Sequence, residues 1–198
     1  MTDVGYDSPM IPYSHYAQVV ANAVRGPTMS ALDEYRLRLR VSPFDVELTR
    51  MNNGRYVTLM DLGRVGIALR CGLLPSMLRK RWTPLVAAVS IRYRRSLRIG
   101  QRFDLVTRVV AFDEKYWYFD QSFEAKGDVY ASAFVKALFH GPAGAVTPRE
   151  MLTAAGTPDL VSPPLPNAMT VWLRSEEAMR LGGSSATALT PPSEHASV

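Results

Sequence analysis

Two acidic residues stand shortly before the start of a predicted helix, an arrangement that could do chemistry. Asp45 and Glu47 lie in a loop that leads to Asn52 and Asn53, and either asparagine can cap a helix N-terminus. The first helical turn offers unpaired backbone N–H groups and the positive end of the helix dipole. A loop carboxylate can fold back to face that turn. The same residues also occur simply as turn and capping residues, and both interpretations stay open.

Arginines gather in the stretch 92–102, which contains Arg92, Arg94, Arg95, Arg98 and Arg102. On a strand Arg92 and Arg94 share one face and Arg95 lies on the other, so the group is not one continuous patch. Arginine is suited to bidentate contact with phosphate, so these residues could bind a phosphate group. The alternative interpretation, that they form a solvated face of the sheet, stays open. A second basic group, residues 79–81, has the same two readings.

Other reactive residue types have simpler interpretations. Asp61 could act at a site, but we favour a local pair with Arg64, because a buried charge needs a partner. Cys71 has no histidine near it in the sequence and is expected to be a buried thiol. The sequence lacks G-x-S-x-G, G-x-x-x-x-G-K, G-x-G-x-x-G and H-E-x-x-H, and it shows no cluster of metal ligands. We therefore expect no cofactor and no metal ion.

The element that must position the loop is the stretch 55–71, which predicts a helix that is apolar on nearly every side. A helix of that kind is buried, and in a chain of this size a sheet must wrap it. Gly72 stands where a C-terminal capping residue belongs.

Strands are predicted on both sides of this helix. Residues 35–41 alternate strictly between apolar and arginine side chains, which is typical of a half-buried strand. Residues 85–93, 102–110, 115–123 and 129–139 also have a period of two, and short hairpin-type connections separate them. The sequence thus predicts an α+β fold with a curved antiparallel sheet of about five strands around one long helix.

The remaining segments extend this domain, which we place at residues 31–156. Residues 1–30 form an N-terminal extension with a short helix bounded by Pro12 and Gly26-Pro27. A short helix is predicted from Thr147, and residues 157–181 form a Pro-rich linker and a C-terminal helix. From Gly182 to residue 198 the composition predicts disorder.

Composition sets wider limits. The chain has 198 residues, one cysteine and a formal net charge of +5, which is a small excess for this length. A single cysteine excludes an internal disulfide framework and suits a reducing compartment. The sequence shows neither a secretory signal nor an apolar run of about 20 residues, so we expect a cytoplasmic protein without a membrane span. Nucleic-acid binding is disfavoured, because no recognition helix or basic-aromatic strand signature is present.

The order of these elements, with Asp45-x-Glu47, Met51-Asn52-Asn53-Gly54-Arg55-Tyr56 and Met60-Asp61-Leu62-Gly63-Arg64, resembles the hotdog-fold acyl-CoA thioesterases. The similarity is greatest to the branch that includes thioesterase superfamily member six and the 4-hydroxybenzoyl-CoA thioesterase-like proteins. It continues through residues 91–97 and 112–115 to residues 163–166, Trp172 and Glu177, and so covers roughly residues 34–181.

This resemblance implies hydrolysis of an acyl-CoA thioester to a carboxylic acid and CoA. Asp45 or Glu47 would be the base or nucleophile, with Asp45 favoured, and Asn52 and Asn53 would bring the helix amides to the thioester carbonyl. Tyr56 would contact the substrate, and Arg94 and Arg95 would hold phosphates of CoA. The resemblance and the exposed sheet edges also imply a homodimer or homotetramer.

The loop departs from the family pattern in ways that bear on activity. Glu47 stands for the second aspartate of the usual Asp-x-Asp, and the loop is one residue short. The family loop usually carries a histidine before the Asn-Asn pair, and here Arg50 occupies that position. The three histidines, His15, His140 and His195, all lie far from the loop in the sequence. The alternative function is therefore a non-catalytic acyl-CoA-binding or interaction module on the same fold.

Overall fold

The structure, a computed structural model, describes residues 13–185 of the chain. The chain divides into two units between Pro164 and Leu165. The elements of the first unit are, in chain order, α1 (Tyr13–Arg25), β1 (Tyr35–Arg40), the 3-10 turn Pro43–Asp45, β2 (Val46–Glu47), β3 (Arg50–Met51), α2 (Asn53–Arg70), α3 (Leu74–Lys80), β4 (Thr83–Tyr93), β5 (Arg102–Phe112), β6 (Trp117–Ala125), β7 (Asp128–Gly141), β8 (Gly144–Val146) and α4 (Pro148–Ala154). The second unit contains α5 (Asn167–Ser185).

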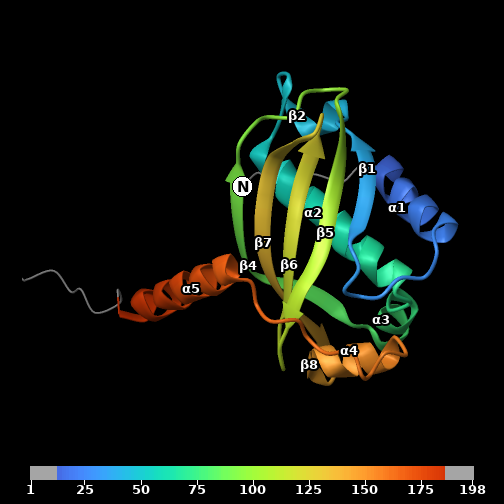
Figure 1. The fold of residues 1–198 in the computed structure, drawn as a ribbon, viewed down its shortest axis with the longest axis vertical. Coiled ribbons are helices and arrows are strands. Elements are labelled where there is room, and N and C mark those ends of the chain that lie inside the picture. The colour runs from blue at the N-terminus through green and yellow to red at the C-terminus, as the bar shows by residue number, and fades with distance from the viewer. Residues whose placement is uncertain (1–12, 186–198) are drawn as a thin grey trace, which may run out of the picture. The chain divides into compact units, whose positions relative to one another are not determined.

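The core of the first unit is a curved antiparallel sheet with α2 lying along its inner face (Figure 1). The strand order is β1-β5-β6-β7-β4, and the short β8 pairs with the end of β7. In β1 the side chains of Tyr35, Leu37 and Leu39 are buried, whereas the arginines between them are exposed. The structure therefore confirms the predicted hotdog fold, in which a sheet wraps one long helix.

The connection between β4 and β5 is not the hairpin that the sequence predicts. β4 pairs with β7, and β5 pairs with β1 and β6, so residues 94–101 cross from one side of the sheet to the other. Along the way they join the loop before α2, where Met51 N–H donates to Leu97 O at 2.8 Å and Ile99 N–H donates to Thr49 O at 3.1 Å. The prediction was wrong because alternation shows which face a side chain occupies but not which strand pairs with which.

Helix α2 is enclosed on most of its surface, as its apolar composition predicts. Its buried apolar side chains include Tyr56, Leu59, Met60, Leu62 and Ile67. Two glycines allow neighbouring side chains to touch its backbone. A Cβ at Gly63 would lie 2.1 Å from Thr107 Oγ1, and one at Gly66 would lie 2.2 Å from Cε1 of Tyr35. Any larger residue at either position would force the helix away from the sheet.

Helices α1, α4 and α5 lie in segments where the sequence predicts a helix, whereas α3 is not predicted. α1 packs against α2 and β1, so the N-terminal helix is docked on the domain. α4 begins after Thr147, which forms a capping box with Glu150. α5 continues to Ser185, past Gly182, where the sequence predicts a disordered tail to begin, and residues 186–198 lie outside the described part. No helix within residues 13–185 is both long enough and apolar enough to cross a membrane.

Candidate functional site

The N-terminus of α2 carries a carboxylate and an available backbone donor. Asn52 is the N-cap: its Oδ1 accepts from Gly54 N–H at 2.7 Å, and its Nδ2 donates to Glu47 Oε1 at 2.6 Å. Asn53 is the first helical residue and is exposed, and its backbone N–H has no partner among residues 13–185. Together these groups place an ionisable oxygen and an unpaired amide at the positive end of the helix dipole.

Asp45 differs from Glu47 in its surroundings. Asp45 is buried, and its Oδ1 accepts from Arg55 Nη2 at 2.9 Å and from Arg55 Nε at 3.1 Å. Its Oδ2 accepts from Ser42 N–H at 2.8 Å. Glu47, by contrast, is exposed. The geometry therefore favours Glu47 over Asp45 as the carboxylate that can reach a substrate, and the catalytic role of either stays a prediction.

A histidine does come close to the loop, contrary to what sequence distance suggests. His15 lies on α1, is buried, and has its Nε2 4.0 Å from Asp45 Oδ2 and 3.4 Å from Arg40 O. The expectation that no histidine lies near the loop is therefore wrong for the folded chain, although His15 is far from the loop in the sequence. The docking of α1 on β1 and α2 produces this contact between residues 30 positions apart, which periodicity cannot reveal.

Tyr56 is a core residue in this structure. Its side chain is buried, its hydroxyl accepts from Leu97 N–H at 3.0 Å, and its ring meets Phe123 edge-on with centroids 4.8 Å apart. Burial raises the pKa of the Tyr56 hydroxyl. These contacts argue against the predicted role of Tyr56 in binding substrate. Tyr93 reaches the N-terminus of α2 from β4, and its hydroxyl donates to Asn53 O at 3.0 Å.

The two arginines predicted to bind phosphate have different positions after β4. Arg95 lines an open hollow with three further cations, Arg50, Arg98 and Lys126, and it also pairs with Asp128. Arg94 is exposed but is not among the residues that line this hollow. The cations that line this hollow therefore differ from the predicted pair, Arg94 and Arg95. Arg50 joins Arg95 and Arg98 there because the segment 94–101 folds over the loop before α2.

An apolar cavity of about 240 Å³ lies further along α2, between that helix and the sheet. Its lining is largely aliphatic and aromatic, with Asp61 and Arg64 as its charged members. Arg64 Nη2 donates to Asp61 Oδ1, which confirms the predicted local pair, and Arg64 Nη1 donates to Gln121 Oε1 at 2.5 Å. Burial lowers the pKa of the Arg64 guanidinium, and the Asp61 carboxylate counters that effect. The cavity could hold an apolar group of modest size.

Within residues 13–185 no group of three histidine, cysteine, aspartate or glutamate side chains is arranged to hold a metal ion. Cys71 is buried and unpaired by any disulfide, and burial raises the pKa of its thiol.

Comparison with known proteins agrees with this architecture. Residues 41–173 match the thioesterase-like superfamily. Protein THEM6 of Danio rerio is 38% identical over 110 residues, which are 55% of this chain and 54% of that protein. Protein THEM6 of Xenopus laevis is 30% identical over 139 residues, 70% of this chain and 66% of that protein. The chain thus spans about half to two thirds of the length of these relatives.

A solved structure shows the same fold at low sequence identity. A gentisyl-coenzyme A thioesterase superposes with a TM-score of 0.54 and 16% identity, over 62% of this chain and 99% of that one. The superfamily match covers more than half of the chain and includes the loop, α2 and the whole of the sheet except β1. The chain therefore belongs to the thioesterase-like superfamily.

Proposed function

We propose that this protein hydrolyses the thioester of an acyl-CoA to a carboxylic acid and CoA. The observation that carries the proposal is that Asn52, the N-cap of α2, holds the Glu47 carboxylate at the helix end where the backbone N–H of Asn53 has no partner among residues 13–185. Membership of the thioesterase-like superfamily and the likeness to a gentisyl-coenzyme A thioesterase support the same reaction class.

The chemistry follows from those two groups. Glu47, as general base, takes a proton from a water molecule whose oxygen attacks the thioester carbonyl carbon. The carbonyl oxygen gains negative charge, which the N–H of Asn53 and the helix dipole stabilise. When the tetrahedral intermediate collapses, the C–S bond breaks and the departing CoA sulfur takes the proton from Glu47. Asn52 holds Glu47 in place through its side-chain amide.

An acyl chain can continue from this point along α2 to the apolar cavity. Asp61, at the edge of the cavity, is eight residues after Asn53, a distance of about 12 Å along a helix. Between them, Tyr93, Ile91 and Val89 of β4 pair with buried residues of β7 and therefore face the core. Their partial exposure leaves an apolar strip beside α2, which suits the hydrocarbon portion of an acyl group.

The basic hollow suits the nucleotide end of CoA. Arg50, Arg95, Arg98 and Lys126 bring four cations to the same end of the molecule as Asn53, because residues 94–101 pair with the loop before α2. Arginine forks match phosphate oxygens. Of the two predicted phosphate ligands, we retain Arg95 for this role, and Arg94 stays a prediction outside the hollow.

A second copy of the chain would cover the exposed edge of the sheet at β4. β4 is an 11-residue edge strand, and its exposed apolar side chains include Leu85, Val86 and Val89. An edge of this length presents unpaired backbone groups that readily pair with another strand. We propose a homodimer formed at β4, or a tetramer of two such dimers. A cytoplasmic location and the lack of a nucleic-acid partner stay expectations.

Turnover of a panel of acyl-CoA thioesters, followed by release of free thiol, tests the function. Glu47→Gln should lower kcat/KM by at least about 10²-fold, since it removes the general base. Glu114→Gln is the matched control, because Glu114 is an exposed carboxylate in the turn between β5 and β6. Binding of acyl-CoA without hydrolysis across the panel would favour the non-catalytic module instead.

A further inference from the structure

The β2–β3 hairpin lies at one end of the first unit, at the top of Figure 1. Apolar side chains are exposed at this end. Leu48, at the turn of the hairpin, is 99% exposed, and Phe44, just before β2, is 79% exposed. Ile99, in the segment between β4 and β5, is 47% exposed. These three side chains contribute nothing to the core of the domain, so their apolar character needs another explanation.

Two backbone contacts hold these loops side by side. Ile99 N–H donates to Thr49 O at 3.1 Å, and Arg50 and Arg98 form an isolated antiparallel bridge. Each loop therefore presents an apolar residue, Leu48 or Ile99, close to an arginine. We call the group Phe44, Leu48, Ile99, Arg50 and Arg98 the loop tip.

Leu48 has an unusual backbone for its residue type. Its φ is +57°, a left-handed conformation that glycine or asparagine adopts at lower cost than a branched apolar residue. No packing of the Leu48 side chain in the core offsets the cost of this backbone conformation, because the side chain is fully exposed. Strain of this kind is typical of functional positions.

The charges around the apolar side chains are mostly positive. Arg50, Arg98 and Lys126 form no ion pair with an acidic side chain within residues 13–185. The exposed Glu47, opposite Arg50 in the β2–β3 pair, is the acidic side chain next to Leu48. Arg95, in the basic hollow, pairs with Asp128. Protruding apolar side chains next to several cations are complementary to an anionic lipid surface, where the apolar groups enter the acyl boundary and the cations contact headgroup phosphates.

We propose that the loop tip docks this protein onto an anionic lipid bilayer. Phe44, Leu48 and Ile99 insert at the boundary between headgroups and acyl chains. Arg50 and Arg98 contact the headgroups, which leaves Arg95 and Lys126 of the basic hollow to the phosphates of CoA. A protein partner is less well matched, because side chains as exposed as Leu48 protrude and do not line a groove. Glu47 lies on the same hairpin, so docking places the candidate site at the lipid surface.

Co-sedimentation of the full chain with vesicles tests the proposal without any measurement of activity. The wild type should bind vesicles of phosphatidylglycerol and phosphatidylcholine and should not bind vesicles of phosphatidylcholine alone. Leu48→Ser should weaken binding at least about tenfold, because it removes a large apolar insertion. Arg50→Gln should weaken it about fivefold, and binding should fall as salt is raised.

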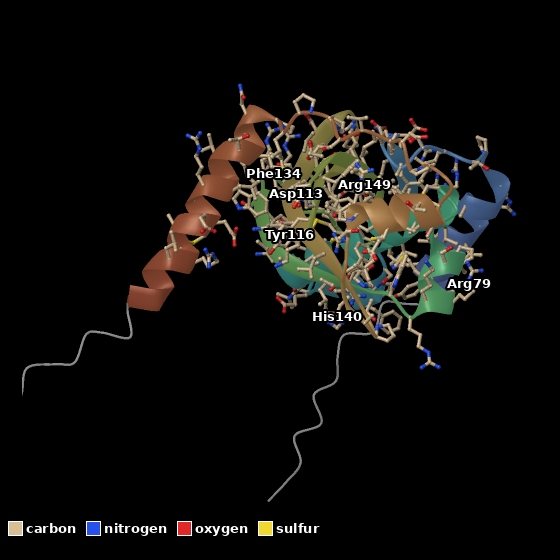
Figure 2. The ribbon with its side chains drawn as sticks, turned by 90° about the horizontal axis from the view of Figure 1, so that it is seen from below. Arg79, Asp113, Tyr116, Phe134, His140 and Arg149 are labelled. Carbon is tan, nitrogen blue, oxygen red and sulfur yellow. The ribbon has the colours of Figure 1, made fainter. Side chains whose placement is uncertain are left out.

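Leu78→Ser is the matched control. Leu78 is 71% exposed on α3, at the opposite end of the domain. That end also carries cations: seen from below, it shows Arg79 on α3 and Arg149 on α4 (Figure 2). Leu78→Ser should bind vesicles like the wild type.

Three results would overturn the proposal. One is that the wild type does not bind anionic vesicles, and another is that Leu48→Ser and the wild type bind them equally. The third is loss of binding in Leu78→Ser alone, which would place the lipid contact at α3. If Leu48→Ser instead lowers the mass measured by light scattering and the wild type does not bind lipid, the loop tip is an interface between copies of the chain.

Discussion

Replacing Asp45 by asparagine separates a structural role of this carboxylate from a chemical one. The change preserves side-chain volume and an oxygen that can still accept from Ser42 N–H, but it removes the charge that Arg55 pairs with. Both partners are buried. Removing one member of a buried ion pair leaves an uncompensated charge and costs about 3–5 kcal/mol of unfolding free energy.

That loss should be visible in both thermal and urea unfolding. For a chain of this length, each 1 kcal/mol lowers Tm by about 2–4 °C, so Asp45→Asn should lower Tm by about 6–20 °C. The m-value in urea should be unchanged if the native fold is retained. The double variant Asp45→Asn with Arg55→Met should recover much of the loss, because the unpaired cation is then gone.

Glu47→Gln gives the complementary result. Glu47 is exposed, so its replacement should change stability by no more than about 0.5 kcal/mol while lowering kcat/KM by at least about 10²-fold. The reasoning fails if Asp45→Asn keeps its Tm within about 1 °C and loses turnover while Glu47→Gln stays active. Asp45 would then be the catalytic carboxylate, and its pair with Arg55 would have to open during catalysis.

Three further outcomes are expected. Arg95→Ala should raise KM for acyl-CoA about fivefold or more and spare kcat, whereas a pantetheine thioester without the nucleotide should be unaffected. Val89→Lys should convert the oligomer measured by light scattering to the 22.0 kDa monomer, because an inward charge on an edge strand opposes strand pairing. Burial alone would raise the pKa of Asp113, but hydrogen bonds from Tyr118 and from two backbone N–H groups, with the charge of Lys136, hold it below its ordinary 3.8. The stability that Asp113 contributes is thus present above pH 3.8 and lost as pH falls below it, so the deficit of Asp113→Asn in unfolding free energy should shrink on acidification.

The fold was predictable because its main elements have strong periodic signals. The apolar stretch 55–71 has no polar face, so it can only be enclosed, and the strict alternation of 35–41 can only be a strand with one buried face. Which strand pairs with which was harder to predict from the sequence. Residues 94–101 contain a glycine and polar residues, as a hairpin turn would, and nothing local shows that they cross the sheet to pair with the loop before α2.

Side-chain direction in the loop could not be read from spacing, and this decides the candidate site. Asp45 and Glu47 are two residues apart, yet the 3-10 turn Pro43–Asp45 aims Asp45 into the domain while the short strand β2 leaves Glu47 exposed. One local signal was available: Ser42 followed three residues later by an acid is the spacing of a capping box, and Asp45 indeed accepts from Ser42 N–H. A capping carboxylate already accepts a hydrogen bond from the backbone N–H at the start of its turn. This spacing alone therefore favours Glu47 over Asp45 as the carboxylate that can act on a substrate. The other half of the arrangement, His15 beside Asp45, depends on how α1 docks, and an amphipathic pattern predicts that a helix packs without predicting what it meets.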